Sequence, residues 1–141
     1  MKSFLLGLTL IFIGKVAACQ DWIYVTSDKD GDKWYIKSSY VKKEADYGSA
    51  ENIKIWTKKE LKKTTIKKKG KALTYTNAKE LQLVIADCND KKIKIITTTV
   101  YNAQGTVIDN YTYEEYEQEW IDIVPDSMGE SMLDKICELF N

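Results

Sequence analysis

The residue types in this chain restrict the chemistry that it can perform. Its 141 residues include neither histidine nor arginine. A chain without histidine cannot form a Ser-His-Asp or Cys-His catalytic group, and it has no histidine metal ligands. A chain without arginine lacks the side chain that most often reads bases in DNA. No nucleophile–base pair and no metal-ligand spacing is visible, so we predict a protein that is not an enzyme, uses no cofactor or metal, and does not bind nucleic acid.

The run DKDGD at residues 28–32 begins like the calcium-binding loop of an EF-hand. That loop requires glycine at its sixth position and a bidentate glutamate at its twelfth. Lys33 and Ser39 occupy these positions here. Asp-Gly is also a strong signal for a tight hairpin turn, because glycine accepts a positive φ. We therefore predict a hairpin turn at this run.

The only strongly basic segment spans residues 58–71 and contains a single acidic residue. Lysines behave as flexible point charges, so such a segment suits an anionic partner, which could be a heparin-like glycan, an acidic lipid headgroup or an acidic patch on a protein. The alternative is a solvated loop with no partner. The candidate partner-binding residues in it are Lys58, Lys59, Lys62, Lys63, Lys67, Lys68, Lys69 and Lys71.

Aromatic and acidic residues alternate near the C-terminus, between residues 111 and 120. Tyrosine and tryptophan are common anchors of protein interfaces, so Tyr111 and Tyr113 are further candidates for partner binding. The same aromatic residues could instead pack beneath a helix with the glutamates pointing outward. We expect this packed role for Trp120 and leave both roles open for the tyrosines.

The N-terminus has the features of an export signal. Residues 4–14 form an apolar run that is too short to span a bilayer but suits a secretory signal. Small residues then precede Cys19, as in bacterial lipoproteins, in which the cysteine is acylated; ordinary cleavage after Ala18 fits the same residues. We predict a signal peptide at residues 1–18, one domain at residues 19–141, and an exported protein. It would be lipid-anchored in the outer membrane through Cys19, or otherwise periplasmic or secreted.

Three cysteines are present, at positions 19, 88 and 137. If Cys19 carries lipid, Cys88 and Cys137 remain as an even pair. A bond between them would close a loop of about 50 residues, which the chain-entropy model values at roughly 4 kcal/mol. Two free buried cysteines in a reducing compartment are the alternative, and the export signal argues against it.

Most of the remaining sequence has the composition of β-strands. Aromatic and β-branched residues, many of them alternating with polar ones, predict strands at residues 22–26, 33–37, 52–58, 81–88, 93–101 and 106–113. We expect a loop at residues 38–50, with a turn at residues 47–49, and a hairpin loop at residues 102–105. The short connections favour antiparallel pairing. The fold class is therefore α+β, with a single antiparallel sheet of about six strands and one C-terminal helix on one face.

The helix is predicted from its start signal and its apolar stripe. Ser127 and Glu130 have the spacing of a capping box, in which each side chain accepts a hydrogen bond from the other's backbone N–H. The stripe that follows comprises Met132, Leu133, Ile136, Cys137 and Phe140. Cys137 lies on this stripe, so a bond to Cys88 would place the helix over the sheet face that carries Val84 and Ala86.

An ordered set of residues resembles the surface-adhesin protein E family of Gram-negative bacteria. It comprises Trp22, Asp30-Gly31 before Trp34-Tyr35-Ile36, Ile55-Trp56, Asp87-Cys88, Gly105-Thr106-Val107, Trp120-Ile121, Pro125 with Ser127, and Cys137. The resemblance implies a similar sheet with a disulfide-linked terminal helix. It also implies an exported protein at the cell surface or in the periplasm, and the best-known members bind host matrix and serum proteins.

These observations lead to two functional hypotheses. The first is a non-enzymatic, adhesin-like surface protein that binds host extracellular-matrix or serum proteins. The second is a periplasm-facing lipoprotein with a structural or accessory role in the envelope and no host ligand. Exposed edge strands would in either case permit self-association.

Overall fold

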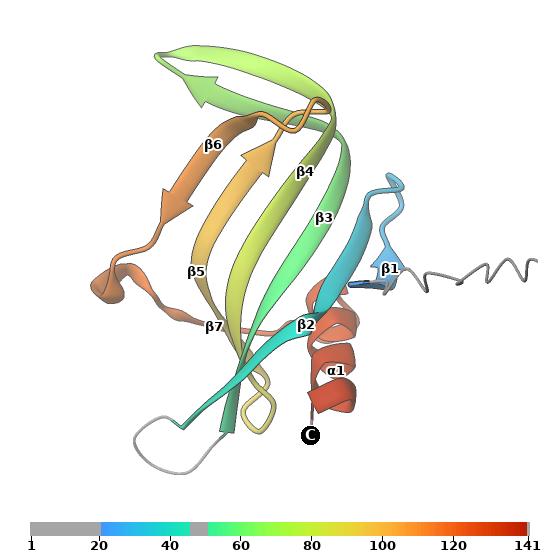
Figure 1. Ribbon diagram of the computed structural model, residues 1–141, viewed down its shortest axis with the longest axis vertical. Helices are drawn as coiled ribbons and strands as arrows, with labels where there is room; N and C mark the ends of the chain where they lie inside the picture. Colours follow the sequence, from blue (N-terminus) through green and yellow to red (C-terminus); the bar gives the residue numbers. More distant parts are fainter. Residues whose placement is uncertain (1–20, 46–50, 141) are drawn as a thin grey trace, which may run out of the picture.

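One antiparallel sheet forms the body of the molecule, and consecutive strands are its neighbours (Figure 1). The computed structural model describes residues 21–45 and 51–140. The strand order is β1-β2-β3-β4-β5-β6, and β7 pairs with the half of β5 that β6 leaves free. The elements are β1 Trp22–Ser27, β2 Lys33–Ala45, β3 Glu51–Lys68, β4 Lys71–Asp87, β5 Lys92–Tyr101, β6 Val107–Thr112, a 3-10 turn at Glu115–Glu117, β7 Trp120–Asp122 and α1 Met128–Phe140. The predicted fold class is confirmed, with one additional short strand.

The segment after the second predicted strand is not a loop where the structure describes it. β2 continues to Ala45, and residues 41–45 pair with residues 51–55 of β3. The register is irregular between Ile36 and Val41, as at a β-bulge. This irregularity breaks the alternation that marks a strand in the sequence, which is why the prediction of a loop is wrong. The turn predicted at residues 47–49 lies outside the described residues.

The lysine-rich segment is also strand rather than loop. β3 and β4 pair in one register from Ile53 to the tip of a long hairpin, where Lys68 pairs with Lys71. A single pair, at Lys62, is missing from this ladder. The two residues between them, Lys69 and Gly70, have φ angles of 49° and 75°. Two positive φ values are what a type I′ hairpin turn requires. The high lysine content hides the strand character of this segment in the sequence, although the segment ends in an ordinary two-residue hairpin turn.

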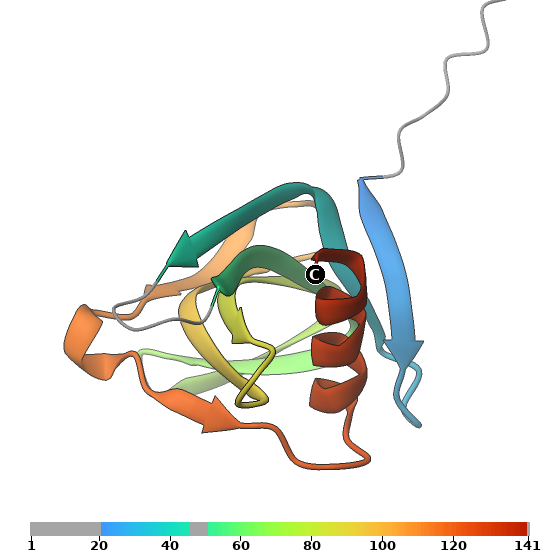
Figure 2. The ribbon, with the colours of Figure 1, turned by 90° about the horizontal axis from the view of Figure 1, so that it is seen from below.

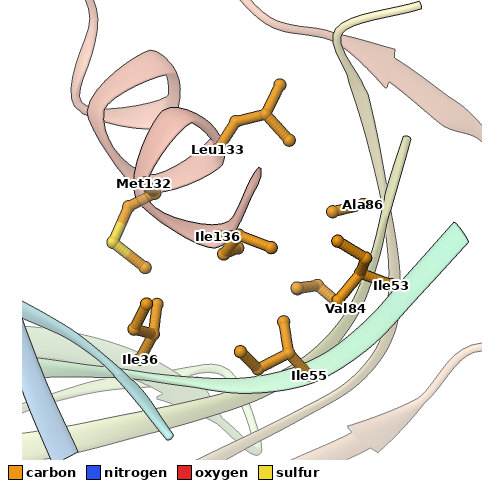
Figure 3. Packing of buried hydrophobic residues seen from close by; sticks show 8 residues of the cluster. All are labelled: Ile36, Ile53, Ile55, Val84, Ala86, Met132, Leu133 and Ile136. Atoms are coloured by element: carbon orange, nitrogen blue, oxygen red, sulfur yellow. The ribbon is translucent and has the colours of Figure 1, made fainter. Parts of the chain in front are cut away.

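The core lies between the sheet and α1. Ile53 and Ile55 pair with Ala86 and Val84 across β3 and β4, so their side chains share one face. Figure 2 shows that the sheet curves around the helix, and Figure 3 shows the helical side chains meeting this face. The buried cluster comprises Ile36, Ile53, Ile55, Val84, Ala86, Met132, Leu133 and Ile136. The predicted stripe is confirmed for Met132, Leu133, Ile136 and Cys137, as is the sheet face that it covers, while the side chain of Phe140 lies outside the described part of the structure.

The ends of the helix are fixed by hydrogen bonds and by a disulfide. The backbone N–H of Glu130 donates to Ser127 Oγ at 3.2 Å, as predicted. The Glu130 carboxylate accepts from the backbone N–H of Asp126 at 2.7 Å, one residue earlier than the capping box predicts. Cys88 and Cys137 form a disulfide, with Cα atoms 5.9 Å apart. The helix is therefore attached covalently to the end of β4.

Candidate functional site

The distal part of the β3–β4 hairpin, residues 62–77, is called the arm here. Figure 1 shows that it bends over the ends of β5 and β6. The bend, or elbow, lies where Lys62 faces Asn77, which is the one pair missing from an otherwise regular register. Asn77 has a φ of 52°, a left-handed conformation that asparagine tolerates better than most residues. The long hairpin thus divides into a part within the sheet and a projecting part.

The turn between β1 and β2 holds the elbow in place. The backbone N–H of Lys62 donates to Asp32 Oδ1 at 2.9 Å. The side chain of Asp32 is nearly buried, and Lys59 Nζ lies 3.4 Å from its other carboxylate oxygen. The backbone N–H of Asp32 in turn donates to Asp28 Oδ1 at 3.0 Å. A polar contact between segments 30 residues apart therefore sets the start of the arm.

The DKDGD run forms the predicted hairpin turn. Asp28 Oδ1 also accepts a hydrogen bond from the backbone N–H of Asp30, as aspartates commonly do in turns. The carboxylates of Asp28 and Asp32 face Lys59, with its Nζ 3.9 and 3.4 Å away. Residues 21–45 and 51–140 include no cluster of side chains suited to holding a metal ion. This turn supports the elbow.

The structure separates the eight candidate lysines into two groups. Lys58 forms an ion pair with Glu60 at 2.9 Å, and its Nζ lies 3.9 Å from the centre of the Tyr35 ring. Lys59 lies on the opposite face of β3, between the aspartates of the turn and the ring of Trp34. Both belong to the body of the sheet. The other six are exposed on the arm: Lys62, Lys63, Lys67, Lys68, Lys69 and Lys71.

Lys58 belongs to an aromatic cluster on the outer face of β1, β2 and β3. Tyr24 packs edge-on against Tyr35, whose hydroxyl donates to Glu60 Oε2 at 3.0 Å. Burial disfavours the charged form of Glu60, but the hydrogen bonds from Lys58 and Tyr35 outweigh it, so the pKa of this carboxyl is lowered. Burial, with the same hydrogen bond to Glu60, raises the pKa of Tyr35. Lys58 is neutralised within this cluster and is not available as a free charge.

The two faces of the arm differ in exposure. On β3 of the arm, Lys63, Thr65 and Lys67 lie on one face, and all three are exposed. Thr65 and its cross-strand partner Thr74 share a hydrogen bond between their hydroxyls at 3.1 Å. The opposite face carries Ile66 and Tyr75, which pack with Ile108 against a second buried cluster of Leu61, Ala78 and Val100. One face therefore fixes the arm to the sheet and the other presents lysines and hydroxyls to solvent.

A depression of about 340 Å³ lies at the elbow, and we call it the elbow pocket. Lys62 and Asn77 contribute from the elbow, Lys79 from β4 and Lys33 from the start of β2. Gly31 forms part of the wall, with a φ of 79°, and a Cβ at this position would collide with the Lys62 ammonium group. Three lysines therefore meet at this pocket with one carboxylate, that of Glu60, which Lys58 and Tyr35 already engage.

The two candidate tyrosines lie away from the lysines of the arm. The rings of Tyr111 and Tyr113 meet edge-on with centroids 4.8 Å apart, at the end of β6. The Tyr111 hydroxyl donates to Glu117 Oε1 at 2.7 Å, and this bond raises the pKa of Tyr111 and lowers that of Glu117. Residues 66–68 of the arm instead border residues 107–110, at the start of β6. The two candidate surfaces are thus at opposite ends of one strand.

Trp120 is half-buried, but it does not pack beneath the helix. Its ring lies under Lys94 of the neighbouring strand β5, with the Nζ atom 4.6 Å from the ring centre. The cluster beneath α1 does not include it. The prediction that Trp120 packs beneath the helix is therefore wrong, because its strand β7 pairs with β5 and directs the ring to Lys94.

Sequence reasoning missed four residues of the elbow pocket: Gly31, Lys33, Asn77 and Lys79. The signal that could have found Lys79 is the extent of the acid-free run, which continues from residue 61 to residue 79. Asn77 within this run marks a possible departure from regular strand geometry. Gly31 and Lys33 join the pocket only through the tertiary fold, so no local pattern indicates them.

The fold is α+β: a curved antiparallel sheet, one disulfide-linked helix and a projecting basic hairpin. Its candidate functional features are exposed surfaces, which is typical of a binding protein. The sequence matches the model of the family described as surface-adhesin protein E over residues 22–138. The chain therefore belongs to this family, and the resemblance noted from its residues is confirmed. No curated protein matches the chain.

Membership in this family indicates an adhesin-like, exported surface protein. Over the two described ranges, no helix is long and apolar enough to cross a membrane. The proposed signal peptide and Cys19 lie outside the described residues.

Proposed function

We propose that this protein is a surface adhesin that binds host extracellular-matrix or serum proteins, with the arm as its principal contact. The observation that supports this role is the presentation of six exposed lysines on an element that projects beyond the main core. A hairpin of this length is not required to cover α1, because the cluster beneath the helix contains no residue of the arm. Tyr111, which is 48% exposed, and its neighbour Tyr113 form a second candidate contact at the far end of β6.

The proposal includes the route by which the protein reaches the surface. Residues 1–18 serve as a signal peptide, and Cys19 of the mature chain carries the lipid that tethers it to the outer membrane. Intact mass of the protein purified from its native membrane tests this step. Acylation would add the mass of the acyl groups to a chain that begins at Cys19, and an unmodified N-terminus would contradict the tether.

Binding is tested with the purified domain, residues 20–141, against immobilised matrix and serum proteins. The arm variant replaces Lys63, Lys67, Lys68 and Lys69 with glutamine. The control variant makes the same change at Lys29, Lys91, Lys92 and Lys135, so both lose four positive charges. We expect the arm variant to lose at least ten-fold in affinity and the control to lose little. Equal losses in both variants would contradict a specific role for the arm.

The alternative is a periplasm-facing lipoprotein with a structural or accessory role in the envelope. It requires the same fold and tether but no host ligand. Protease treatment of intact cells separates the two hypotheses. Removal of the protein supports surface display, whereas full protection places it in the periplasm and contradicts the adhesin role.

A further inference from the structure

Few carboxylates lie near the lysines of the arm, and none forms an ion pair with them within the described residues. Asp30 and Asp32 border a depression with Lys62 and Lys63, and Asp109 borders one with Lys67 and Lys68. The arm, residues 62–77, contains six lysines and no acidic residue, and Lys79 follows shortly after it. Ion pairs form at lysines 37, 58, 59, 91, 92 and 135, and none of these lysines belongs to the arm. Neighbouring ammonium groups repel one another, so an arrangement of this kind favours an anionic ligand.

The tip of the arm keeps a lysine where the backbone does not favour one. Lys69 has a φ of 49°, in the left-handed region where asparagine or glycine is preferred at this position of a type I′ turn. Lysine at this position costs folding free energy relative to asparagine. Local turn chemistry therefore does not explain Lys69, whereas a requirement for charge at the tip does.

The chemistry of the exposed face favours a sulfated chain among anionic ligands. Lys63 and Lys67 are four residues apart on one strand, which places them roughly 13 Å from each other along the arm. The hydroxyls of Thr65 and Thr74 lie between them. Ammonium groups bind sulfate groups, and hydroxyls bind sulfate or sugar oxygens, along an extended chain.

Other anionic surfaces fit the arm less well. A membrane surface is usually bound by several apolar side chains beside the basic ones. Among the large apolar side chains of the arm, Leu73 alone exceeds a third exposed, at 41%. An acidic protein surface usually meets aromatic anchors, and the exposed face around Lys63 and Lys67 has none.

We propose that the arm binds a sulfated polysaccharide, with one sulfate in the elbow pocket and the following sugar units along the face of Lys63 and Lys67. Lys33, Lys62 and Lys79 line the pocket and face the sulfate, and the one carboxylate in the lining, that of Glu60, is held by Tyr35 and Lys58. The inference rests on the proposed adhesin function and specifies the ligand: the sulfated chains that matrix proteins carry. Matrix binding then depends on glycan sulfation.

The test measures binding of the domain to heparin by titration calorimetry over a series of salt concentrations. Lys62→Gln with Lys79→Gln removes two charges from the pocket, and Lys63→Gln with Lys67→Gln removes two from the face. Lys91→Gln with Lys135→Gln is the matched control. We expect each of the first two variants to bind at least ten-fold more weakly, with the slope of log K against log salt reduced by about one per lysine. A control that loses as much would overturn the proposal, because net charge alone would then explain binding.

Lys69→Asn provides an independent test, because it should change stability and heparin affinity in opposite directions. The melting temperature should rise, because asparagine suits the turn, while heparin affinity should fall. Stability and affinity that rise together would contradict a role for the lysine at the tip.

Competing ligands distinguish this proposal from the adhesin function itself. Chemically desulfated heparin should fail to bind, and vesicles containing phosphatidylglycerol should bind more weakly than heparin. If the domain binds a matrix protein equally well after its glycans have been removed, and does not bind heparin, the glycan proposal fails and the adhesin function stands. If it binds neither the intact matrix proteins nor heparin, both fail.

Discussion

The carboxylate of Asp32 serves two elements at once. One oxygen accepts the backbone N–H of Lys62 at the elbow, and the other faces the ammonium group of Lys59 within the sheet. A backbone N–H that has lost its strand partner needs another acceptor, since a buried unpaired amide is costly. Asp32 supplies that acceptor, so the direction of the arm depends on a residue of the β1–β2 turn.

Replacing Asp32 with alanine should therefore destabilise the protein by about 1–3 kcal/mol, the cost of leaving a partly buried donor and charge unpaired. Asp32→Asn should lose less, because its amide oxygen can still accept from Lys62. Asp30→Ala is the control in the same turn, because its side chain is exposed, and it should change stability by less than about 0.5 kcal/mol. Urea unfolding measures all three, and equal effects of the two alanine substitutions would show that the elbow contact contributes little.

Glu80 should make the stability of the protein depend on pH. Burial raises the pKa of this carboxyl, while the charge of Lys59 partly opposes the rise. The folded state then holds the proton more tightly than the unfolded chain. Stability contributed by the protonated form is present below the unfolded pKa of about 4.3 and is lost as pH rises through the folded pKa. Glu80→Gln should accordingly be more stable than the native protein at pH 7.

The difference between the two proteins should shrink as pH falls below about 4. Urea midpoints at a series of pH values measure it, with Glu115→Gln as the exposed control. A Glu80→Gln protein that is less stable at pH 7 would show that attraction between Glu80 and Lys59 outweighs the cost of burying the carboxylate.

Which lysines are free could not be predicted from the sequence. Lys58 and Lys59 are adjacent to the others and have the same local composition. They differ only because strand alternation directs one to the aromatic cluster of β1 and β2 and the other to Asp32. These partners lie about 25 residues away along the chain, so their effect appears only once the register of the hairpin is known.

At the scale of elements, the helix and its attachment were predictable and the arm was not. The start signal at Ser127 and the stripe through Ile136 are local patterns, and Cys137 on this stripe could be matched to Cys88 at the end of an apolar strand. On the β3 side of the arm Ile66 stands alone among lysines and threonines, so no apolar alternation marks that strand. On the β4 side Leu73 and Tyr75 alternate with Thr74 and Thr76, a strand signal that the prediction does not use. Its bend depends on a hydrogen bond between Asp32 and Lys62, which no local pattern encodes.

The disulfide should contribute a large part of the stability of the domain. Cys88 and Cys137 are separated by 49 positions, and closing a loop of that size limits the unfolded chain by about 4 kcal/mol in the entropy model. Replacing both cysteines with serine in a domain that begins at residue 20 should lower the free energy of unfolding by that order. Urea unfolding with and without reductant measures it. The serine variant should not respond to reductant, and an unchanged midpoint on reduction of the native domain would contradict the prediction.

The contact of α1 with the sheet is tested by two leucines on the same helix. Leu133 is 2% exposed within the core, and Leu139 is 38% exposed near the end of the helix. Leu133→Ala should cost about 2–5 kcal/mol, because it leaves a cavity between the helix and β3. Leu139→Ala makes the same chemical change at a more exposed site and should cost less than about 1 kcal/mol. Thermal unfolding of both variants measures the contrast, and similar losses would indicate that the helix is loosely packed.

At the scale of the whole molecule, the charges are separated along the sequence. The basic segment at residues 58–71 occupies the hairpin, while residues 109–138, which hold ten acidic residues and one lysine, form β6, β7 and the helix. The near-neutral total therefore conceals a basic projection on a more acidic body. Such a separation orients the molecule toward an anionic surface, and its effect weakens as salt increases.

The division into body and arm predicts that the arm can be shortened without loss of the fold. Thr64 and Tyr75 occupy the same kind of register position as Lys68 and Lys71, which close the native turn. Replacing residues 65–74 with Asn-Gly should form an equivalent type I′ turn between them. The variant loses the contact of Ile66 with the second cluster, which should cost roughly 1–3 kcal/mol, but keeps the helix, the disulfide and the main core.

Circular dichroism should therefore still show a folded β-rich domain, the disulfide should be intact, and thermal unfolding should remain cooperative with a lower midpoint. Affinity for matrix proteins and heparin should fall to the level of the arm variant. The same deletion tests both parts of the argument, since folding and binding are measured on one protein. A shortened domain that fails to fold would show that the arm is part of the core. A folded one that still binds its ligands with native affinity would move the binding surface to the body, with Tyr111 and Tyr113 as the next residues to replace.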